Sequence, residues 1–174
     1  MVILKTKATV CTSLFVFLLV GSGFSQEVSN TITQAHAGQV LTIAISADQS
    51  KILSGGSDKR SYHWDLKAAS KLKSFAGHSG NITAVAYSSN SKLFATGGAD
   101  KRMIVWDAEL GKPKKILRAE GEVTSIAFNP INDNIGSGYL NNKVTIWDAT
   151  AGKLIAEMSG HEKAVNSVSF SSDG

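Results

Sequence analysis

The sequence repeats itself about every 42 residues, and this period constrains the fold more than any local motif does. The stretch LSGGSDKRSYHWD (53–65) returns as ATGGADKRMIVWD (95–107), with seven of the thirteen positions identical. The three tryptophans lie at positions 64, 106 and 147, and an aspartate follows each one. Self-similarity at a fixed period of roughly 20 to 50 residues is typical of repeat architectures. The chain is therefore predicted to be an array of similar units.

Within each unit the apolar residues alternate with polar ones. Short segments of this kind recur in register as TIAIS (42–46), AVAYS (84–88), SIAFN (125–129) and SVSFS (167–171). Turn residues separate them from further short apolar segments, and no stretch after residue 25 has a helical apolar face of ten or more residues. Short strands split by turn residues indicate an all-β protein. Each unit is predicted to be a four-stranded antiparallel sheet.

The first 25 residues differ from the rest. Two lysines precede an unbroken apolar run at 14–20, and small residues follow that run. This order of segments is typical of a secretory signal peptide. We predict a signal peptide at 1–25, cleaved before Gln26, and export to the periplasm, surface or medium of a bacterium. An uncleaved membrane anchor is the alternative, because residues 8–25 carry no charge.

Charge and cysteine content exclude two further classes. Without Lys5 and Lys7 the exported chain has 16 basic and 14 acidic residues, a net charge of +2. That is too small a surplus to predict nucleic-acid binding, which needs a clustered basic face. Cys11 is the only cysteine and lies inside the predicted signal peptide, so no disulfide framework is expected. Packing and hydrogen bonds must then stabilise the fold.

The repeated motifs resemble those of the WD40 repeat family of β-propellers, over residues 36–174. Gly77-His78 and Gly160-His161 resemble the family's Gly-His dipeptides, and the three Trp-Asp pairs resemble its characteristic ends. The resemblance implies an all-β fold of WD40-type propeller blades, each a four-stranded antiparallel sheet. The repeats in the sequence would form three blades and the start of a fourth, so the array is expected to be incomplete.

The resemblance also implies a structural hydrogen-bond network in each blade. A histidine, a hydroxyl, a turn aspartate and the tryptophan would converge, and an indole N–H needs such a partner when it is buried. The third unit departs from the pattern, with Ala119 at the histidine position and Asn141 for the aspartate, so we expect it to be the least stable. The residues assigned to these networks are His36, Ser54, Asp58, Trp64, His78, Thr96, Asp100, Trp106, Ser137, Asn141, Trp147 and His161.

The same residue types admit a hydrolytic triad as an alternative. A triad needs an accessible hydroxyl with a base within reach. Here the set occurs once per unit and loses two members in the third. Catalytic residues are rarely repeated in every unit of a tandem array, whereas residues that stabilise the fold commonly are. We therefore favour a structural role for the set and predict no catalytic residues, no metal ligands and no cofactor.

The period also divides the chain into segments. After the signal peptide comes an N-terminal segment at 26–35, interpreted as a possible outer strand that closes a ring. The repeats that follow are predicted at 36–77, 78–118, 119–160 and, truncated, 161–174. The chain ends on Asp173-Gly174, a dipeptide typical of hairpin turns. We therefore interpret the sequence as an N-terminal fragment of a longer protein.

Propellers of this family usually bind partners on the face formed by the first-strand entrances and the turns before the third strands. The corresponding candidates are Gln39, Ser57, Asn81, Ala99, Glu122 and Leu140. The leading hypothesis is an exported, non-enzymatic scaffold for protein–protein interaction, with a protein or peptide partner, no nucleic acid, and no membrane contact after signal cleavage. The alternative is the N-terminal propeller of a larger enzyme, for example a peptidase fusion. The basic pairs at 59–60 and 101–102 are interpreted as solvated strand ends.

Overall fold

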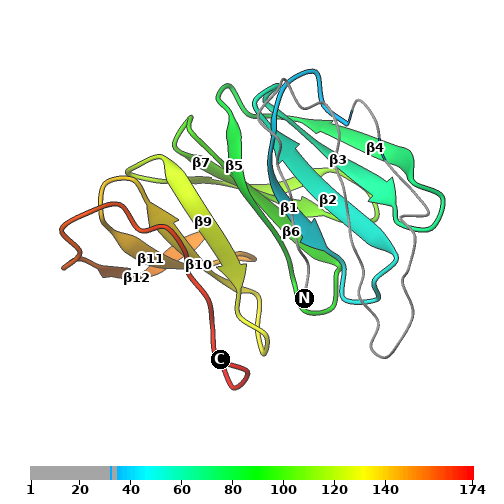
Figure 1. The fold of residues 1–174 in the computed structure, drawn as a ribbon. Helices are drawn as coiled ribbons and strands as arrows, with labels where there is room; N and C mark the ends of the chain where they lie inside the picture. The colour runs from blue at the N-terminus through cyan, green and yellow to red at the C-terminus, as the bar shows by residue number, and fades with distance from the viewer. Residues whose placement is uncertain (1–31, 33–34) are drawn as a thin grey trace, which may run out of the picture.

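The computed structural model describes Ile32 and residues 35–174. It confirms an all-β fold built of three separate four-stranded antiparallel sheets (Figure 1). The predicted signal peptide at 1–25, and most of the segment at 26–35, lie outside the described residues. Within the described part of the chain there is no helix long and apolar enough to cross a bilayer.

Each sheet corresponds to one sequence unit and has its strands in chain order. Blade 1 consists of β1 (Val40–Ile45), β2 (Lys51–Gly56), β3 (Arg60–Asp65) and β4 (Ser70–Ala76). Blade 2 consists of β5 (Ile82–Tyr87), β6 (Leu93–Gly98), β7 (Arg102–Asp107) and β8 (Pro113–Arg118). Blade 3 consists of β9 (Val123–Phe128), β10 (Asn134–Tyr139), β11 (Val144–Asp148) and β12 (Lys153–Met158).

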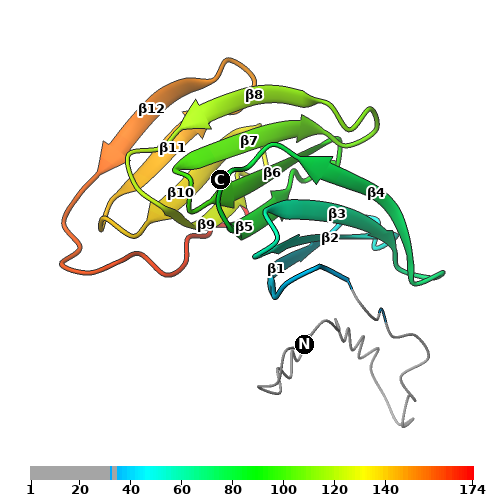
Figure 2. The ribbon, with the colours of Figure 1, turned by 90° about the horizontal axis from the view of Figure 1, so that it is seen from above.

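The blades stand side by side as an open arc. The first strands, β1, β5 and β9, lie along one side, and the last strands, β4, β8 and β12, lie along the other (Figure 2). Because successive strands are antiparallel, the turn after each second strand and the loop between blades lie at one end of the sheets. The turns after each first and third strand lie at the opposite end. The arc therefore has two chemically distinct ends.

Apolar side chains from neighbouring blades form the cores between them. Leu53 of blade 1 packs with Phe94 and Trp106 of blade 2 in one buried cluster. The rings of Phe94 and Trp106 are stacked, with centroids 5.8 Å apart. A second cluster joins Met103 of blade 2 to Tyr139 of blade 3. Burial of apolar area at these blade interfaces provides the main favourable free energy for the arc.

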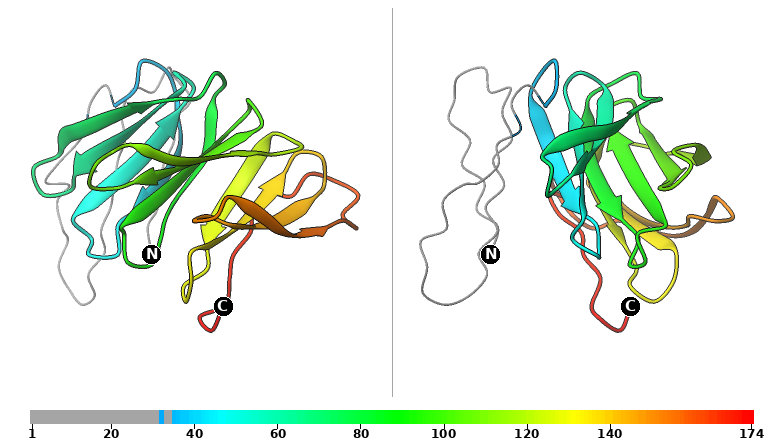
Figure 3. Two further views of the ribbon diagram at one scale, coloured as in Figure 1. Left: turned by 180° about the vertical axis from the view of Figure 1, so that it is seen from behind. Right: turned by 90° about the vertical axis from the view of Figure 1, so that its right-hand side faces the viewer.

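The segment after β12 lies against blade 3 (Figure 3). The N–H of Val165 donates to the carbonyl of Tyr139 at 3.1 Å, and the N–H of Val168 donates to Ser125 Oγ at 3.1 Å. Val165 is buried, and Phe170 packs over Gly136. The residues predicted to begin a fourth blade thus occupy the position next to blade 3 that β5 occupies next to blade 1.

Candidate functional site

In blade 1 the four residues of the predicted network are joined through one hydroxyl. Trp64 Nε1–H donates to Ser54 Oγ at 2.8 Å, and the same oxygen lies 2.8 Å from His36 Nε2. His36 Nδ1 lies 2.8 Å from Asp58 Oδ1. The single proton of Ser54 must go to Nε2, because the indole N–H already donates to this oxygen. A neutral imidazole that donates from Nδ1 to Asp58 satisfies every group in the chain.

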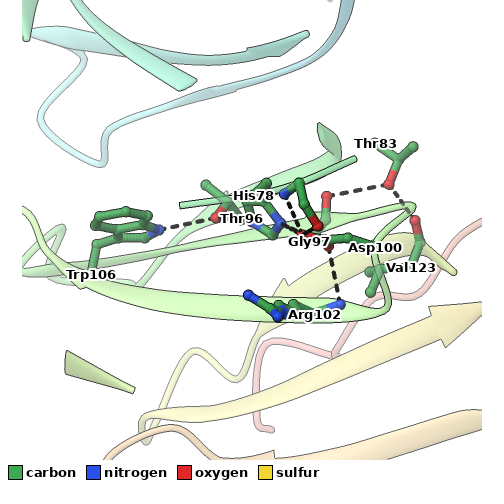
Figure 4. Close-up of polar contacts among 9 residues, drawn as sticks. His78, Thr83, Thr96, Gly97, Asp100, Arg102, Trp106 and Val123 are labelled. Atoms are coloured by element: carbon green, nitrogen blue, oxygen red, sulfur yellow. Dashed lines mark hydrogen bonds and ion pairs between the residues drawn. The ribbon is translucent and has the colours of Figure 1, made fainter. Parts of the chain in front are cut away.

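Blade 2 repeats this arrangement with threonine in place of serine (Figure 4). Trp106 Nε1–H donates to Thr96 Oγ1 at 3.0 Å, and Thr96 Oγ1 lies 2.8 Å from His78 Nε2. His78 Nδ1 lies 2.9 Å from Asp100 Oδ1. A glycine makes room for each histidine, because a Cβ on Gly56 would lie 2.4 Å from His36 Nδ1, and one on Gly98 would lie 2.8 Å from His78 Nδ1.

The two aspartates also organise the turns that contain them. Asp100 accepts from the backbone N–H of Ser79 at 2.8 Å and from that of Arg102 at 3.2 Å. Burial acts to raise the pKa of Asp100, but the hydrogen bond from His78 and the one from the backbone of Ser79 outweigh it, so this pKa lies below its usual value. The pKa of Asp58 is lowered in the same way, against burial, first by its hydrogen bond with His36. Burial lowers the pKa of His36, which favours the neutral imidazole.

The connectivity in both blades is that of a hydrolytic triad, with the carboxylate on Nδ1 and the hydroxyl on Nε2. The hydroxyl groups, however, are closed to substrate. Ser54 and Thr96 are both 0% exposed, and each already accepts the N–H of a buried tryptophan. A nucleophile must reach a substrate carbonyl, so these clusters act as internal supports of the blades.

Blade 3 forms a different hydroxyl cluster, which sequence reasoning missed. Tyr139 stands at the repeat position of Gly56 and Gly98, and it is fully buried. Its hydroxyl lies 2.6 Å from Ser137 Oγ and 2.5 Å from Thr145 Oγ1. Trp147 Nε1–H donates to Thr145 Oγ1 at 2.7 Å. The phenol thus reaches the hydroxyl that recurs in each repeat from the strand itself, where the other blades use a histidine from the preceding loop.

Two predicted members of the third and fourth networks lie elsewhere. The structure places Asn141 on the surface, with its side chain beside Gly121 and outside the hydroxyl cluster. His161 is exposed on the segment after β12. The sequence did contain a signal for the role of Tyr139, because this residue aligns with a glycine in each of the other two repeats. A large side chain at this position leaves no room for a histidine, and the small residue Ala119 stands at the histidine position.

The candidate partner-face residues come together in pairs at one end of the blades. The N–H of Ala99 donates to the carbonyl of Asn81 at 2.9 Å, and the N–H of Leu140 donates to the carbonyl of Glu122 at 2.9 Å. In blade 1 the N–H of Ser57 donates to the carbonyl of Gln39 at 2.9 Å, and Ser57 Oγ accepts from the N–H of Gln39 at 2.8 Å. Each blade therefore holds its pair in a fixed backbone geometry, with both side chains exposed or half-buried.

The described part of the chain offers no cluster of side chains suited to a metal ion. Over residues 32 and 35–174, no three histidine, cysteine or acidic side chains lie close enough together to hold a metal ion. His36 and His78 are instead committed to the carboxylate and hydroxyl partners described above.

The fold and its buried clusters define an all-β repeat protein built of four-stranded blades. Comparison with known families identifies the family. The WD domain, G-beta repeat (WD40) model matches residues 27–65, 69–107, 111–148 and 152–174, and the chain belongs to this family. The first three matched segments end at the Trp-Asp pairs, whereas the repeats predicted above begin at 36, 78, 119 and 161, so those boundaries stay a prediction.

Two solved structures share the fold. One is described as the structure of U3-55K and the other as the crystal structure of RRP9 WD40 repeats. Each is 22% identical to this chain, with a TM-score of 0.75 over 78% of it. The chain spans 43% of the length of each of these structures. Among curated proteins, the comparison gave no match.

Proposed function

We propose that this protein is an interaction scaffold that binds a protein or peptide partner through the turn face at one end of its blades. WD40 domains generally bind protein partners, and their propellers are typically non-catalytic. The observation that carries the proposal is the set of three backbone-paired positions, one pair per blade. These are Gln39 with Ser57, Asn81 with Ala99, and Glu122 with Leu140.

The chemistry of this face favours a polar contact with one apolar element. Gln39, Asn81 and Glu122 are exposed, and Leu140 is 54% exposed at the blade 3 end. None of the six candidate positions is a tryptophan, tyrosine or arginine, the residue types that dominate high-affinity interfaces. Several modest contacts, spread over the blades, would therefore share the binding free energy. No catalytic step is assigned to the chain, because the hydroxyls of blades 1 and 2 are buried.

Site-specific photo-crosslinking in the native cell tests this proposal. A photoreactive p-benzoylphenylalanine would replace Asn81 in the full-length gene product, with Ala68 as the matched exposed control at the opposite end of the blades. We expect a discrete crosslinked protein band at Asn81 and none at Ala68. Equal crosslinking at both positions, or none at Asn81, would contradict the proposal.

We further propose that the scaffold acts outside the cytoplasm after removal of residues 1–25. The support is the sequence pattern of that segment, which has two lysines followed by the apolar run at 14–20 and by small residues. N-terminal sequencing of the protein from its native cells should begin at Gln26. Retention of Met1 on protein from the membrane fraction would favour the uncleaved anchor instead.

A further inference from the structure

A cleft of about 390 Å³ lies between blades 2 and 3, at the end of the blades opposite the candidate partner face. Lys92 and Asp133 border it from the turns after β5 and β9, and Lys114 and Lys115 border it from β8. Buried Leu93 contributes apolar surface to its lining. The volume is near the lower limit of ligand pockets, roughly 300–1,000 Å³, which suits a short segment rather than a whole domain.

The corresponding groove between blades 1 and 2 is filled by one lysine. Lys73 Nζ crosses to blade 2 and donates to the carbonyl of Leu110 at 2.6 Å. Its side chain runs close over Gly111, where a Cβ would lie 2.4 Å from Lys73 Cε. Gly111 has a φ of +67°, a backbone conformation that glycine adopts at little cost. The first interblade groove is thus closed by the protein itself.

Lys115 stands at the same repeat position as Lys73 but does not close the second groove. Its stem passes Gly152, where a Cβ would lie 3.2 Å from Lys115 Cδ. Its ammonium group makes no hydrogen bond or ion pair with any residue that the structure describes, and neither does that of Lys92. Two half-exposed or exposed cations therefore border an open cleft without an internal partner.

Charge in the cleft is unbalanced. Three lysines face one carboxylate, that of Asp133, among the lining residues. Lys114 is exposed and has a distant partner, with Nζ 3.7 Å from Asp107 Oδ2. In contrast, Lys143 on the other end of blade 3 is fully engaged, at 2.5 Å from Glu120 and 2.7 Å from Glu157. The cleft therefore has an excess of positive charge, whereas the charge of Lys143 elsewhere on the surface is neutralised by nearby glutamates.

We propose that this cleft binds a short acidic peptide segment of a partner protein. Carboxylates of the segment would pair with Lys92 and Lys115, in the role that the Leu110 carbonyl has for Lys73. An apolar side chain of the same segment would lie on Leu93 and Ala149. Because the cleft and the candidate partner face lie at opposite ends of the blades, this site does not depend on the function proposed above.

Fluorescence anisotropy with the full chain tests the proposal. The probe is a fluorescein-labelled hexapeptide of alternating glutamate and leucine, and the control probe has glutamine for each glutamate. We expect the Lys92→Gln/Lys115→Gln variant to bind the acidic probe about tenfold more weakly. The matched variant Lys59→Gln/Lys101→Gln removes two exposed lysines from the opposite end and should change binding less than about twofold.

A charge-reversal pair keeps the test specific. Lys92→Glu/Lys115→Glu should lose the acidic probe and gain affinity for a lysine–leucine hexapeptide, while thermal unfolding confirms that the variant is folded. Equal losses in the two glutamine variants would show nonspecific attraction and overturn the proposal. Equal binding of the glutamine probe and the acidic probe would also overturn the proposal. Full displacement of the acidic probe by millimolar inorganic phosphate would overturn it in favour of a small-anion site.

Discussion

Tyr139 and Ala119 are a compensating pair at the level of single residues. In blades 1 and 2 a histidine from the loop fills the space above a glycine, and a Cβ on that glycine would collide with the imidazole. In blade 3 the glycine is replaced by tyrosine and the histidine by alanine. The buried hydroxyl of Ser137 still receives a partner, at 2.6 Å. A buried polar group left without a partner costs about 1–3 kcal/mol, which explains why the two positions differ together.

Tyr139→Phe should lower the free energy of unfolding of the chain by about 1–3 kcal/mol. The change removes the hydroxyl that contacts Ser137 and Thr145 but keeps the ring, so the loss reports the polar cluster alone. Urea denaturation followed by tryptophan fluorescence measures it. An unchanged transition midpoint would show that the cluster does not stabilise blade 3.

Blade 3 should also be able to form the histidine–aspartate network that blades 1 and 2 contain. Tyr139→Gly alone leaves a cavity and should cost roughly 3–5 kcal/mol. Adding Ala119→His and Asn141→Asp rebuilds the histidine–aspartate network of blade 2, and the triple variant should be more stable than Tyr139→Gly by about 1–3 kcal/mol. Independent, additive losses from the three changes would contradict this compensation.

His63 predicts a pH dependence of stability. It is 3% exposed among Phe75, Phe94 and Tyr87, and its Nε2 has no partner within the described chain. Burial, with smaller effects of Lys51 and Lys73, lowers the pKa of His63 to about 4. The unfolded chain therefore binds this proton first as the pH falls.

Stability should thus be complete above pH ~6.5 and fall as the pH is lowered toward ~4, by about 3 kcal/mol at most from this residue. His63→Val introduces the residue that blade 2 has at the same position, Val105, and should reduce the slope of unfolding free energy against pH. Part of the slope will remain, because burial also lowers the pKa of His36. His161→Gln, at an exposed site, is the control; a slope unchanged in His63→Val would contradict the assignment.

At the level of strands, a threonine on the first strand of blades 2 and 3 bridges to the segment that follows in the array. Thr83 on β5 donates to the carbonyl of Val123 on β9 and lies 3.2 Å from the carbonyl of Gly97. Thr124 on β9 donates to the carbonyl of Val165 in the segment after β12. The same position on β1 is Leu41, which is 41% exposed, so this contact is missing between blades 1 and 2.

Leu41→Thr should therefore add a bridge to the carbonyl of Ile82 and raise the free energy of unfolding by about 0.5–1.5 kcal/mol. Chemical denaturation of the full chain measures the change. Leu41→Val keeps the branched shape without the hydroxyl and is the matched control. Equal effects of threonine and valine would show that β-branching, and not the hydrogen bond, is responsible.

At the level of the whole molecule, blade 2 links the other two. Its first strand contacts both β1 and β9, whereas no extensive contact joins a strand of blade 1 to one of blade 3 in the described part of the chain. In such a linear array stability is close to a sum of each unit and its neighbour interfaces. Loss of the middle unit should therefore release both neighbours.

Thr96→Val removes the hydroxyl shared by His78 and Trp106 and should destabilise blade 2 by about 2–4 kcal/mol. In hydrogen exchange followed by mass spectrometry, we expect peptides from all three blades to lose protection. The equivalent change in blade 1, Ser54→Ala, should affect mainly β1–β4. Loss of protection confined to blade 2 in the Thr96 variant would show that each blade folds independently.

Most of the architecture could be predicted because its signals are local. Alternating apolar residues specify strands, and Asp58 and Asp100 in their turns set the hairpins before the third strands. The residues of the buried clusters in blades 1 and 2 recur at the same spacing in both repeats, so the sequence period was enough to predict which residues belong to each cluster. Tyr139 and Thr145 escaped prediction because their role depends on the empty space above Ala119, which no spacing along the chain reports.

The period of about 42 residues was enough to establish a row of four-stranded blades, since every element it requires forms from contacts within one unit. The tertiary structure alone decided how adjacent units differ. Lys73 crosses to Leu110 and closes one interblade groove, whereas Lys115 leaves the next one open. Both lysines occupy the same place in the repeat. Their different roles arise from distances between atoms of separate sheets, which depend on packing and not on the order of residues within a unit.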